Sequence, residues 1–178
     1  MAMAANSAPR ARWCPNRRLW GLAGLFMIGI AALSAISAWR GTHLLLINMS
    51  ASLPNWAFLV HRGEAPARGG YAFFNPPRTA LLVRHFGARP QPFAKIVYGM
   101  PGDLVTHAGA NVSINGRLVA RMKPATRLGE PLTPGATGRV PAGCYYLGTP
   151  HPDGFDSRYG EIGFVCARQI IGTGEPIL

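Results

Sequence analysis

Lysine is scarce in this chain of 178 residues, where only Lys95 and Lys123 occur among eighteen lysines and arginines. Arginine stays charged in proteins, so the arginines are excluded as proton acceptors. Lys95 lies in an apolar segment, residues 92–98, whose pattern predicts a buried strand. Burial disfavours the charged amine and lowers its pKa. Lys95 is therefore a candidate general base.

Motifs for several other chemistries are missing. The three cysteines form no Cys-x-x-Cys pair and the five histidines show no ligand spacing, so we expect no metal and no cofactor. No histidine belongs to a recognisable triad motif such as Gly-x-Ser-x-Gly. The net charge of +11 is compatible with nucleic acid, but no basic-aromatic motif accompanies it. We therefore expect no nucleic-acid partner and interpret the charge as a solvated surface near an anionic membrane.

Charged residues are also missing from an apolar run of 21 residues, 19–39. As a helix, this run is long enough to cross a hydrocarbon core of about 30 Å. Four arginines precede the run, and Arg40 follows it directly. By the positive-inside rule, we predict a basic cytoplasmic tail at residues 1–18, a transmembrane anchor at 19–39 and an exported domain at 40–178.

A cleaved secretory signal is the alternative to a retained anchor. The segment Ala35-Ile36-Ser37 has the small-x-small pattern of a cleavage site. The apolar run exceeds the usual 7–15 residues of such signals, which favours the anchor. Both interpretations export the rest of the chain. Cys144 and Cys166 then lie where disulfides persist, and the sequence leaves open whether they pair.

The exported part is predicted to be an all-β domain of short antiparallel strands. Its many glycines and prolines favour turns over long helices, and no helical period is visible after residue 40. Asn115-Gly116 predicts a type I′ hairpin turn. Residues 124–138 are predicted to be a loop. The segments predicted as strands are residues 44–48, 70–74, 80–85, 93–98, 112–114, 117–119, 144–148 and 162–171.

Ser52 is a candidate nucleophile for a lysine base, since serine–lysine variants of the catalytic triad exist. It follows a predicted strand and precedes Pro54, which favours an extended or turn backbone. The hydroxyl of Ser50 and the backbone N–H of Ser52 are candidate donors to an oxyanion. Taken alone, this segment fits an ordinary serine-rich loop better, since isolated serines near turns are the rule.

Four motifs follow one another along the chain: Ser52-x-Pro54 after a single anchor, Lys95-x-x-x-Gly-x-Pro-Gly-Asp103, the Asn-Gly hairpin, and Asp156-Ser-Arg-Tyr-Gly160. This order resembles the Ser-Lys signal peptidase superfamily, over about residues 44–171. Within it, the chain is most similar to TraF-type conjugative transfer peptidases. It is short, has one anchor and lacks the large inserted domain of the housekeeping enzymes.

The resemblance implies a role for each matching residue. Ser52 corresponds to the nucleophile, Lys95 to the general base and Ser50 to the side-chain oxyanion donor. Asp156 and Arg158 correspond to a supporting pair near the site, or to a purely structural ion pair.

Two positions depart from the pattern of the family. Trp56 stands where the TraF-type segment usually has glycine, which affects the turn after the nucleophile. Gly154 stands where a serine often contacts the lysine, so Lys95 is expected to be oriented by another group.

The resemblance also implies a fold, a location and a function. We expect a signal-peptidase-like β domain on one transmembrane helix in the bacterial inner membrane, with the catalytic domain in the periplasm. The partners would be the lipid bilayer, a pilin or preprotein substrate and the conjugation machinery. The enzyme would be a serine endopeptidase that cuts signal-like segments after small residues, and would mature a conjugative pilin precursor with or without peptidyl transfer.

Two further alternatives stay open. One is a general type I signal peptidase for exported proteins, and the other is a non-enzymatic anchored β domain of a conjugation or secretion complex. The aromatic side chains near the predicted site are expected either to contact lipid or to belong to the core; they are Trp56, Phe58, Phe73 and Phe74.

Overall fold

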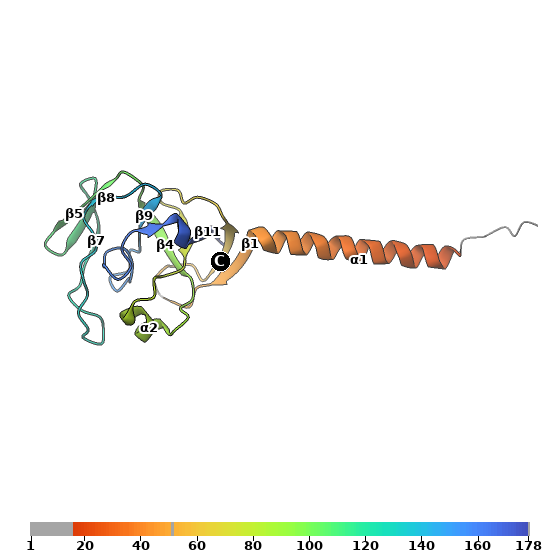
Figure 1. The fold of residues 1–178 in the computed structure, drawn as a ribbon, viewed down its shortest axis with the longest axis horizontal. Helices are drawn as coiled ribbons and strands as arrows, with labels where there is room; N and C mark the ends of the chain where they lie inside the picture. Colours follow the sequence, from red (N-terminus) through yellow and green to blue (C-terminus); the bar gives the residue numbers. More distant parts are fainter. Residues whose placement is uncertain (1–15, 51, 178) are drawn as a thin grey trace, which may run out of the picture. The chain divides into compact units, whose positions relative to one another are not determined.

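The computed structural model describes residues 16–50 and 52–177 (Figure 1). The chain separates into two compact units, Met1–Arg40 and Gly41–Leu178. The first consists mainly of one helix, and the second carries the strands and all of the candidate site residues. Of the predicted basic tail, residues 1–15 lie outside the described residues.

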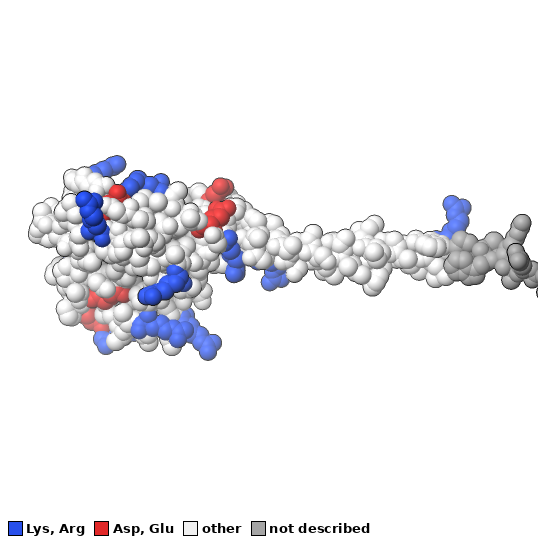
Figure 2. All heavy atoms as spheres, turned by 45° about the horizontal axis from the view of Figure 1, so that its top comes forward, with Lys and Arg blue, Asp and Glu red and all other residues white. Residues whose placement is uncertain are grey.

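The helix α1 spans Arg17–Thr42 and contains the predicted 21-residue run. Its length and composition are sufficient to cross a membrane, and its position near the N-terminus also suits a signal sequence. Figure 2 shows an uncharged helix surface with cationic side chains near its two ends. The helix is therefore compatible with a membrane anchor or a signal sequence, and its uncharged length matches the apolar run in the sequence.

Antiparallel strands build the second unit, as the turn-rich sequence predicts. Within the described residues they form a sheet of seven and a sheet of four. In spatial order, the larger sheet consists of β1 (His43–Ile47), β2 (Ala57–Arg62), β11 (Ile170–Pro176), β3 (Tyr71–Phe74), β4 (Phe93–Gly99), β9 (Cys144–Gly148) and β10 (Val165–Cys166). The smaller sheet consists of β7 (Arg117–Arg121), β6 (Asn111–Ile114), β5 (Leu104–Ala108) and β8 (Gly138–Arg139).

The segment 80–85 corrects the sequence prediction, because it is a helix and not a strand. This helix, α2, spans Ala80–Phe86. The hydroxyl of Thr79 accepts a hydrogen bond from the N–H of Leu82 at 3.3 Å, and Gly87 ends the helix with a φ of 82°. Only seven residues long, the helix gives too short an apolar pattern to distinguish the two structures.

The end of the chain departs from the prediction in a second way. The single strand predicted at residues 162–171 is two strands, β10 and β11, separated by the 3₁₀ helix Ala167–Gln169. The polar residues Arg168 and Gln169 interrupt the apolar run at this turn. β11 continues to Pro176 and pairs with both β2 and β3. β2, β5 and the two-residue β8 were not predicted.

The predicted Asn-Gly hairpin is confirmed. Asn115 and Gly116 both have positive φ angles, 50° and 81°, and they connect β6 to β7. A disulfide joins Cys144 on β9 to Cys166 on β10, where the two residues face each other in the strand register. The structure thus settles the pairing that the sequence left open.

A buried cluster supports the loop that follows β1. It contains Leu53, Phe58, Val60 and Phe73, each less than 5% exposed. Two of the aromatic residues of uncertain position, Phe58 and Phe73, are therefore core residues, as is Phe74. Trp56 is 55% exposed. Burial of Leu53 anchors the residue next to Ser52 in the core.

Candidate active site

Ser52 lies in the loop between β1 and β2, and Asn48 holds this loop together. The backbone N–H of Asn48 donates to the carbonyl of Trp56 at 2.7 Å, which closes the loop at its base. The Asn48 side-chain amide donates to the carbonyls of Leu53, at 3.2 Å, and Asn55, at 2.9 Å. We call residues 48–50 and 52–56 the nucleophile loop, after the candidate nucleophile Ser52; one asparagine and one buried leucine contribute to fixing it.

The two serines predicted to act together are in direct contact. The hydroxyl oxygens of Ser50 and Ser52 are 2.8 Å apart. Ser50 also donates its hydroxyl to Asn48 Oδ1 at 2.9 Å, and its backbone N–H donates to the same oxygen at 3.0 Å. Because a hydroxyl carries one proton, Ser52 donates to Ser50 in this arrangement. Ser50 must turn away from Asn48 before it can donate to an oxyanion.

Lys95 occupies a central strand, as predicted. β4 pairs with β3 on one side and β9 on the other, with Lys95 opposite Ala72 and Ile96 opposite Gly148. The side chain is only 5% exposed, on the same face of the strand as Val97. Its amine lies over the ring of Phe93, at 5.8 Å from the ring centre. The backbone ladder and the aromatic ring thus fix the position of the amine.

The environment of Lys95 favours its neutral form. Burial lowers the pKa of the amine from its ordinary value of 10.5 to about 8. The negative charge of Asp156 opposes this shift, and the positive charge of Arg158 adds to it. With a pKa of about 8, roughly one tenth of the amine is neutral at pH 7 and most of it above pH 8, far more than for an ordinary lysine, and this neutral form is the one that can act as a general base.

Asp156 and Arg158 form a buried ion pair. Arg158 Nε donates to one carboxylate oxygen at 2.8 Å and Nη2 to the other at 2.9 Å. The two residues are 0% and 2% exposed. Burial raises the pKa of Asp156, whereas Arg158 and Lys95 lower it. The pair does not line the cavity that contains Ser52, so its influence on Lys95 is electrostatic.

Gly154 leaves no room for the serine that often occupies this position. A Cβ atom built there would lie 2.0 Å from Cγ2 of Thr149 and 3.0 Å from a carboxylate oxygen of Asp156. Within the described residues, the space that a side chain at 154 would need is filled by Thr149. That another group orients Lys95 stays a prediction; the groups that act on the amine are the ring of Phe93 and the charges of Asp156 and Arg158.

The predicted Pro-Gly-Asp turn fixes the end of β4. Asp103 accepts hydrogen bonds from the N–H of Met100 at 2.7 Å, from Asn115 at 2.8 Å and from Arg68 at 2.7 Å. Burial raises the pKa of Asp103, but these bonds together lower it below its ordinary value. Gly102 supplies the positive φ of the turn, 89°. Arg68 also donates to the carbonyl of Tyr98 at 2.8 Å, which ties the turn to the strand.

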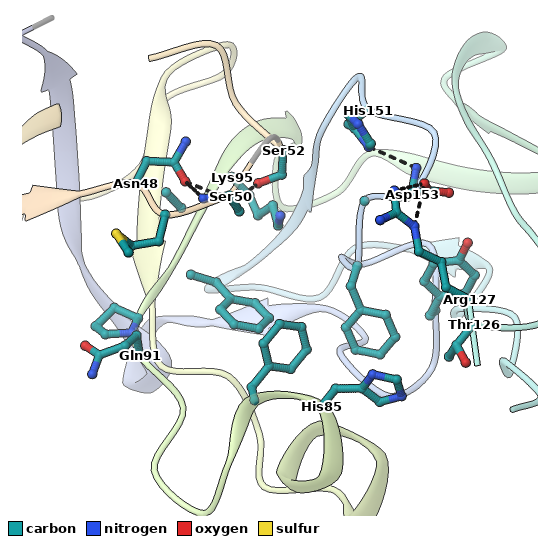
Figure 3. Close-up of a pocket in the computed structure, with 18 of the residues that line it drawn as sticks. Asn48, Ser50, Ser52, His85, Gln91, Lys95, Thr126, Arg127, His151 and Asp153 are labelled. Carbon is teal, nitrogen blue, oxygen red and sulfur yellow. Dashed lines mark hydrogen bonds and ion pairs between the residues drawn. The ribbon is translucent and has the colours of Figure 1, made fainter. Parts of the chain in front are cut away.

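Ser50, Ser52 and Lys95 line one cavity of about 1040 Å³ (Figure 3). Figure 3 shows Asn48, Ser50, Ser52 and Lys95 at one side, with Arg127 and Asp153 across the cavity. Apolar side chains form most of the lining; among them are Leu45, Leu46, Ile47, Leu81, Phe86, Phe93, Leu132 and Phe155. Such a lining suits an apolar peptide segment better than a charged one.

Ion pairs hold the far wall of the cavity, formed by α2 and residues 123–132. Lys123 and Arg127 both pair with Asp153, and Arg84 and His85 both pair with Glu130. The hydrogen bond from His85 contributes most to a lowered pKa of Glu130.

Among the described residues, no group of three or more His, Cys, Asp or Glu side chains could hold a metal ion.

Comparison with known proteins assigns the chain to a family. A family model described as signal peptidase, peptidase S26, matches residues 17–178. The chain belongs to this family. The resemblance found in the sequence motifs is thereby confirmed, and membership supports a serine peptidase hydrolase.

Two individual proteins are similar to this signal peptidase family member. The conjugal transfer protein TraF of Agrobacterium fabrum is 26% identical over 173 residues, which cover 90% of this chain and 93% of the relative. The crystal structure of a signal peptidase I from Enterococcus faecalis is 22% identical. It aligns with 62% of this chain and 97% of its own, with a TM-score of 0.38.

Sequence reasoning on this peptidase identified the groups in the cavity but missed two that position them. Asn48 was predicted only as the last residue of a strand, although it contacts both ends of the loop. Thr149 was not noted, and its hydroxyl donates to the backbone carbonyl of Ser52. The only local signal at Thr149 is its place at the end of a buried strand.

Proposed function

We propose that this protein is a membrane-anchored serine endopeptidase with Ser52 as nucleophile and Lys95 as general base. One observation carries the proposal: a lysine that is 5% exposed, with a pKa lowered to about 8, shares a cavity with a serine hydroxyl. Serine is a weak nucleophile until a neighbouring base takes its proton. Membership of the peptidase S26 family supports the same chemistry.

The reaction follows from this arrangement. Neutral Lys95 takes the proton of Ser52, and Ser52 attacks the carbonyl carbon of the scissile peptide bond. The hydroxyl of Ser50 turns from Asn48, and together with the N–H of Ser52 it stabilises the oxyanion. The protonated lysine then gives its proton to the leaving amine. Water hydrolyses the resulting acyl-enzyme, or an amine accepts the acyl group.

Asp156 and Arg158 support this chemistry from behind the cavity. The carboxylate raises the affinity of Lys95 for a proton, which opposes the effect of burial. Arg158 neutralises the carboxylate through two short hydrogen bonds and prevents a larger effect. We infer that the pair tunes the base and does not contact the substrate.

The substrate class is a precursor with an apolar, signal-like segment. The apolar lining of the cavity favours such a segment, and β1 ends the seven-stranded sheet beside it, where an extended peptide can add as a strand. We propose cleavage after small residues in an Ala-x-Ala-like pattern. The similarity to a conjugal transfer protein supports a pilin precursor as the substrate, with the conjugation machinery as its surroundings.

We propose that α1 is a retained anchor in the bacterial inner membrane. The arginines before the apolar run, with a single arginine just after it, support a cytoplasmic N-terminus and a periplasmic catalytic domain. The lipid bilayer is then a partner, and the substrate reaches the site from the same membrane.

The test compares Ser52→Ala with the wild-type protein in membranes. A precursor with a small-x-small site is added, and cleavage is followed by the change in its mass. We expect no detectable product from Ser52→Ala. Ser113→Ala, on the four-stranded sheet, is the matched control and should cleave at the wild-type rate. Product from the Ser52→Ala protein would contradict the proposed nucleophile.

A general signal peptidase is the second candidate, because the family model carries that description. A general signal peptidase and a peptidase dedicated to conjugation differ in whether the cell needs the enzyme for growth. Deletion of the gene from a cell that holds no other signal peptidase should stop growth if the enzyme is general. If the enzyme is dedicated to conjugation, the deletion should abolish pilus production and leave growth unchanged.

A further inference from the structure

Thr149 contacts the nucleophile loop from a different part of the fold. It follows β9, and its hydroxyl donates to the backbone carbonyl of Ser52. A carbonyl oxygen only accepts hydrogen bonds, so the direction of this bond is fixed. The same hydroxyl oxygen accepts the N–H of His151 at 3.3 Å. Thr149 is 1% exposed, and its side chain therefore has both its donor and its acceptor in use.

The backbone of Thr149 is fixed by the buried ion pair. Its N–H donates to a carboxylate oxygen of Asp156 at 3.1 Å, and its carbonyl accepts from Arg158 at 2.6 Å. Asp156 and Arg158 are themselves locked together and buried. Thr149 thus connects the rigid pair that acts on Lys95 to the backbone of Ser52.

The methyl group of Thr149 also explains the glycine at position 154. A Cβ atom at residue 154 would lie 2.0 Å from Cγ2 of Thr149, far inside van der Waals contact. Thr149 is branched at Cβ and buried, so its choice of rotamer is restricted. Gly154 lines the cavity together with Ser52 and Lys95. A side chain at 154 would therefore displace Thr149 from the nucleophile loop.

We propose that Thr149 is a positioning residue of the peptidase reaction, and that Gly154 is needed because Thr149 occupies its side-chain space. This inference rests on the proposed function, since it requires Ser52 to be the nucleophile. The hydrogen bond fixes the carbonyl of Ser52 and with it the backbone that carries the Ser52 side chain into the cavity it shares with Lys95. Loss of the bond lets the loop move, and a displacement of about 1 Å at a reacting group lowers the rate by about 100-fold.

A purely structural role for Thr149 makes a different prediction. If its hydroxyl only supports the turn at residues 149–154, through the N–H of His151, then its loss lowers stability alone. A positioning role lowers kcat at temperatures where the protein is fully folded. The two roles are therefore separated by kinetics measured together with the melting temperature.

The experiment uses the full-length protein in detergent and two substitutions of Thr149. Thr149→Val keeps the shape and removes the hydroxyl, whereas Thr149→Ser keeps the hydroxyl. We expect Thr149→Val to lower kcat about 10- to 100-fold with KM within about 3-fold, and Thr149→Ser to stay within about 3-fold of wild type. A wild-type kcat for Thr149→Val, or an equal loss in both variants, would overturn the inference.

Ser52→Ala, measured in parallel, separates this inference from the proposed function. If Ser52→Ala still cleaves the precursor, the proposed function fails. If Ser52→Ala is inactive and Thr149→Val is fully active, the proposed function stands and only the role of Thr149 fails.

A double-mutant cycle tests whether the methyl group of Thr149 occupies the space that a side chain at position 154 would need. Gly154→Ala is introduced into the wild type and into Thr149→Ser, which lacks the clashing methyl group. We expect Gly154→Ala to lower kcat and the melting temperature in the wild type, and to lower both by much less in Thr149→Ser. An equal loss in the two backgrounds would show that Thr149 does not determine the need for glycine.

Discussion

The two candidate catalytic groups are held in different ways, Lys95 by a strand and Ser52 by a loop. β4 is hydrogen-bonded to a neighbour on each side, which fixes the backbone of Lys95, and the amine lies over the ring of Phe93. The nucleophile loop has no such ladder. Its geometry depends on hydrogen bonds from the side chains of Asn48 and Thr149 and on the burial of Leu53.

Because of this difference, the base and the nucleophile should respond to different kinds of substitution. The position of the base is protected by many backbone bonds, and its chemistry depends on burial, which sets its pKa. The nucleophile needs no change in pKa, and its reactivity depends on a few side chains that aim it. Substitutions at β4 should therefore change protonation, whereas substitutions around the loop should change geometry.

The largest effect is expected from Lys95→Arg. Arginine retains its charge at every accessible pH and cannot accept the proton of Ser52. We expect kcat/KM to fall about 1,000-fold or more, within the range known for loss of a general base. Because a buried permanent charge also destabilises, Lys95→Met is measured beside it and should show the same loss with a fold retained by circular dichroism.

Lys123→Arg is the matched comparison for this prediction. Lys123 is the only other lysine in the chain, and its side chain is 40% exposed and paired with Asp153. Arginine can keep that ion pair, so the loss should be far smaller than for Lys95. Equal losses in the two arginine variants would contradict a special role for Lys95.

The sequence predicts Lys95 well because its signal is local. The apolar residues around it in the chain are also the residues that make β4 a buried strand, and burial explains the lowered pKa. The hairpin at Asn115-Gly116 is predictable for the same reason, since two residues decide the turn. The local pattern predicts the wrong structure at α2, because its seven apolar and basic residues fit a strand as well as a helix.

Of the two missed residues that position Ser52, Asn48 is close in sequence, but Thr149 is distant, and no local pattern reveals its contact. Thr149 is 97 residues from Ser52 in the sequence, and only the folded domain brings it to the loop. The requirement for Gly154 depends in turn on Thr149. No pattern within either segment reveals that the two positions share one space.

An intermediate effect is expected from Asn48→Ala. This substitution removes two hydrogen bonds to the loop carbonyls and two from Ser50. At about 1 kcal/mol for each bond to the loop carbonyls, kcat/KM should fall about 30-fold, and loss of alignment for Ser50 would increase this toward 100-fold. Asn111→Ala, at the exposed start of β6, should have no effect. A fully active Asn48→Ala protein would show that the loop needs no such support.

The pH dependence of kcat/KM distinguishes the strand from the loop, and the smallest expected effect is that of a loop substitution on its midpoint. Burial lowers the pKa of Lys95 to about 8, so below that pH the protonated amine cannot act as a base. The rate should rise about tenfold per pH unit up to about pH 7, bend near 8 and level off above it. Asn48→Ala acts on geometry, so it should lower the plateau without moving the midpoint. A profile that is flat between pH 6 and 9, or a midpoint that moves in Asn48→Ala, would contradict this division between base and loop.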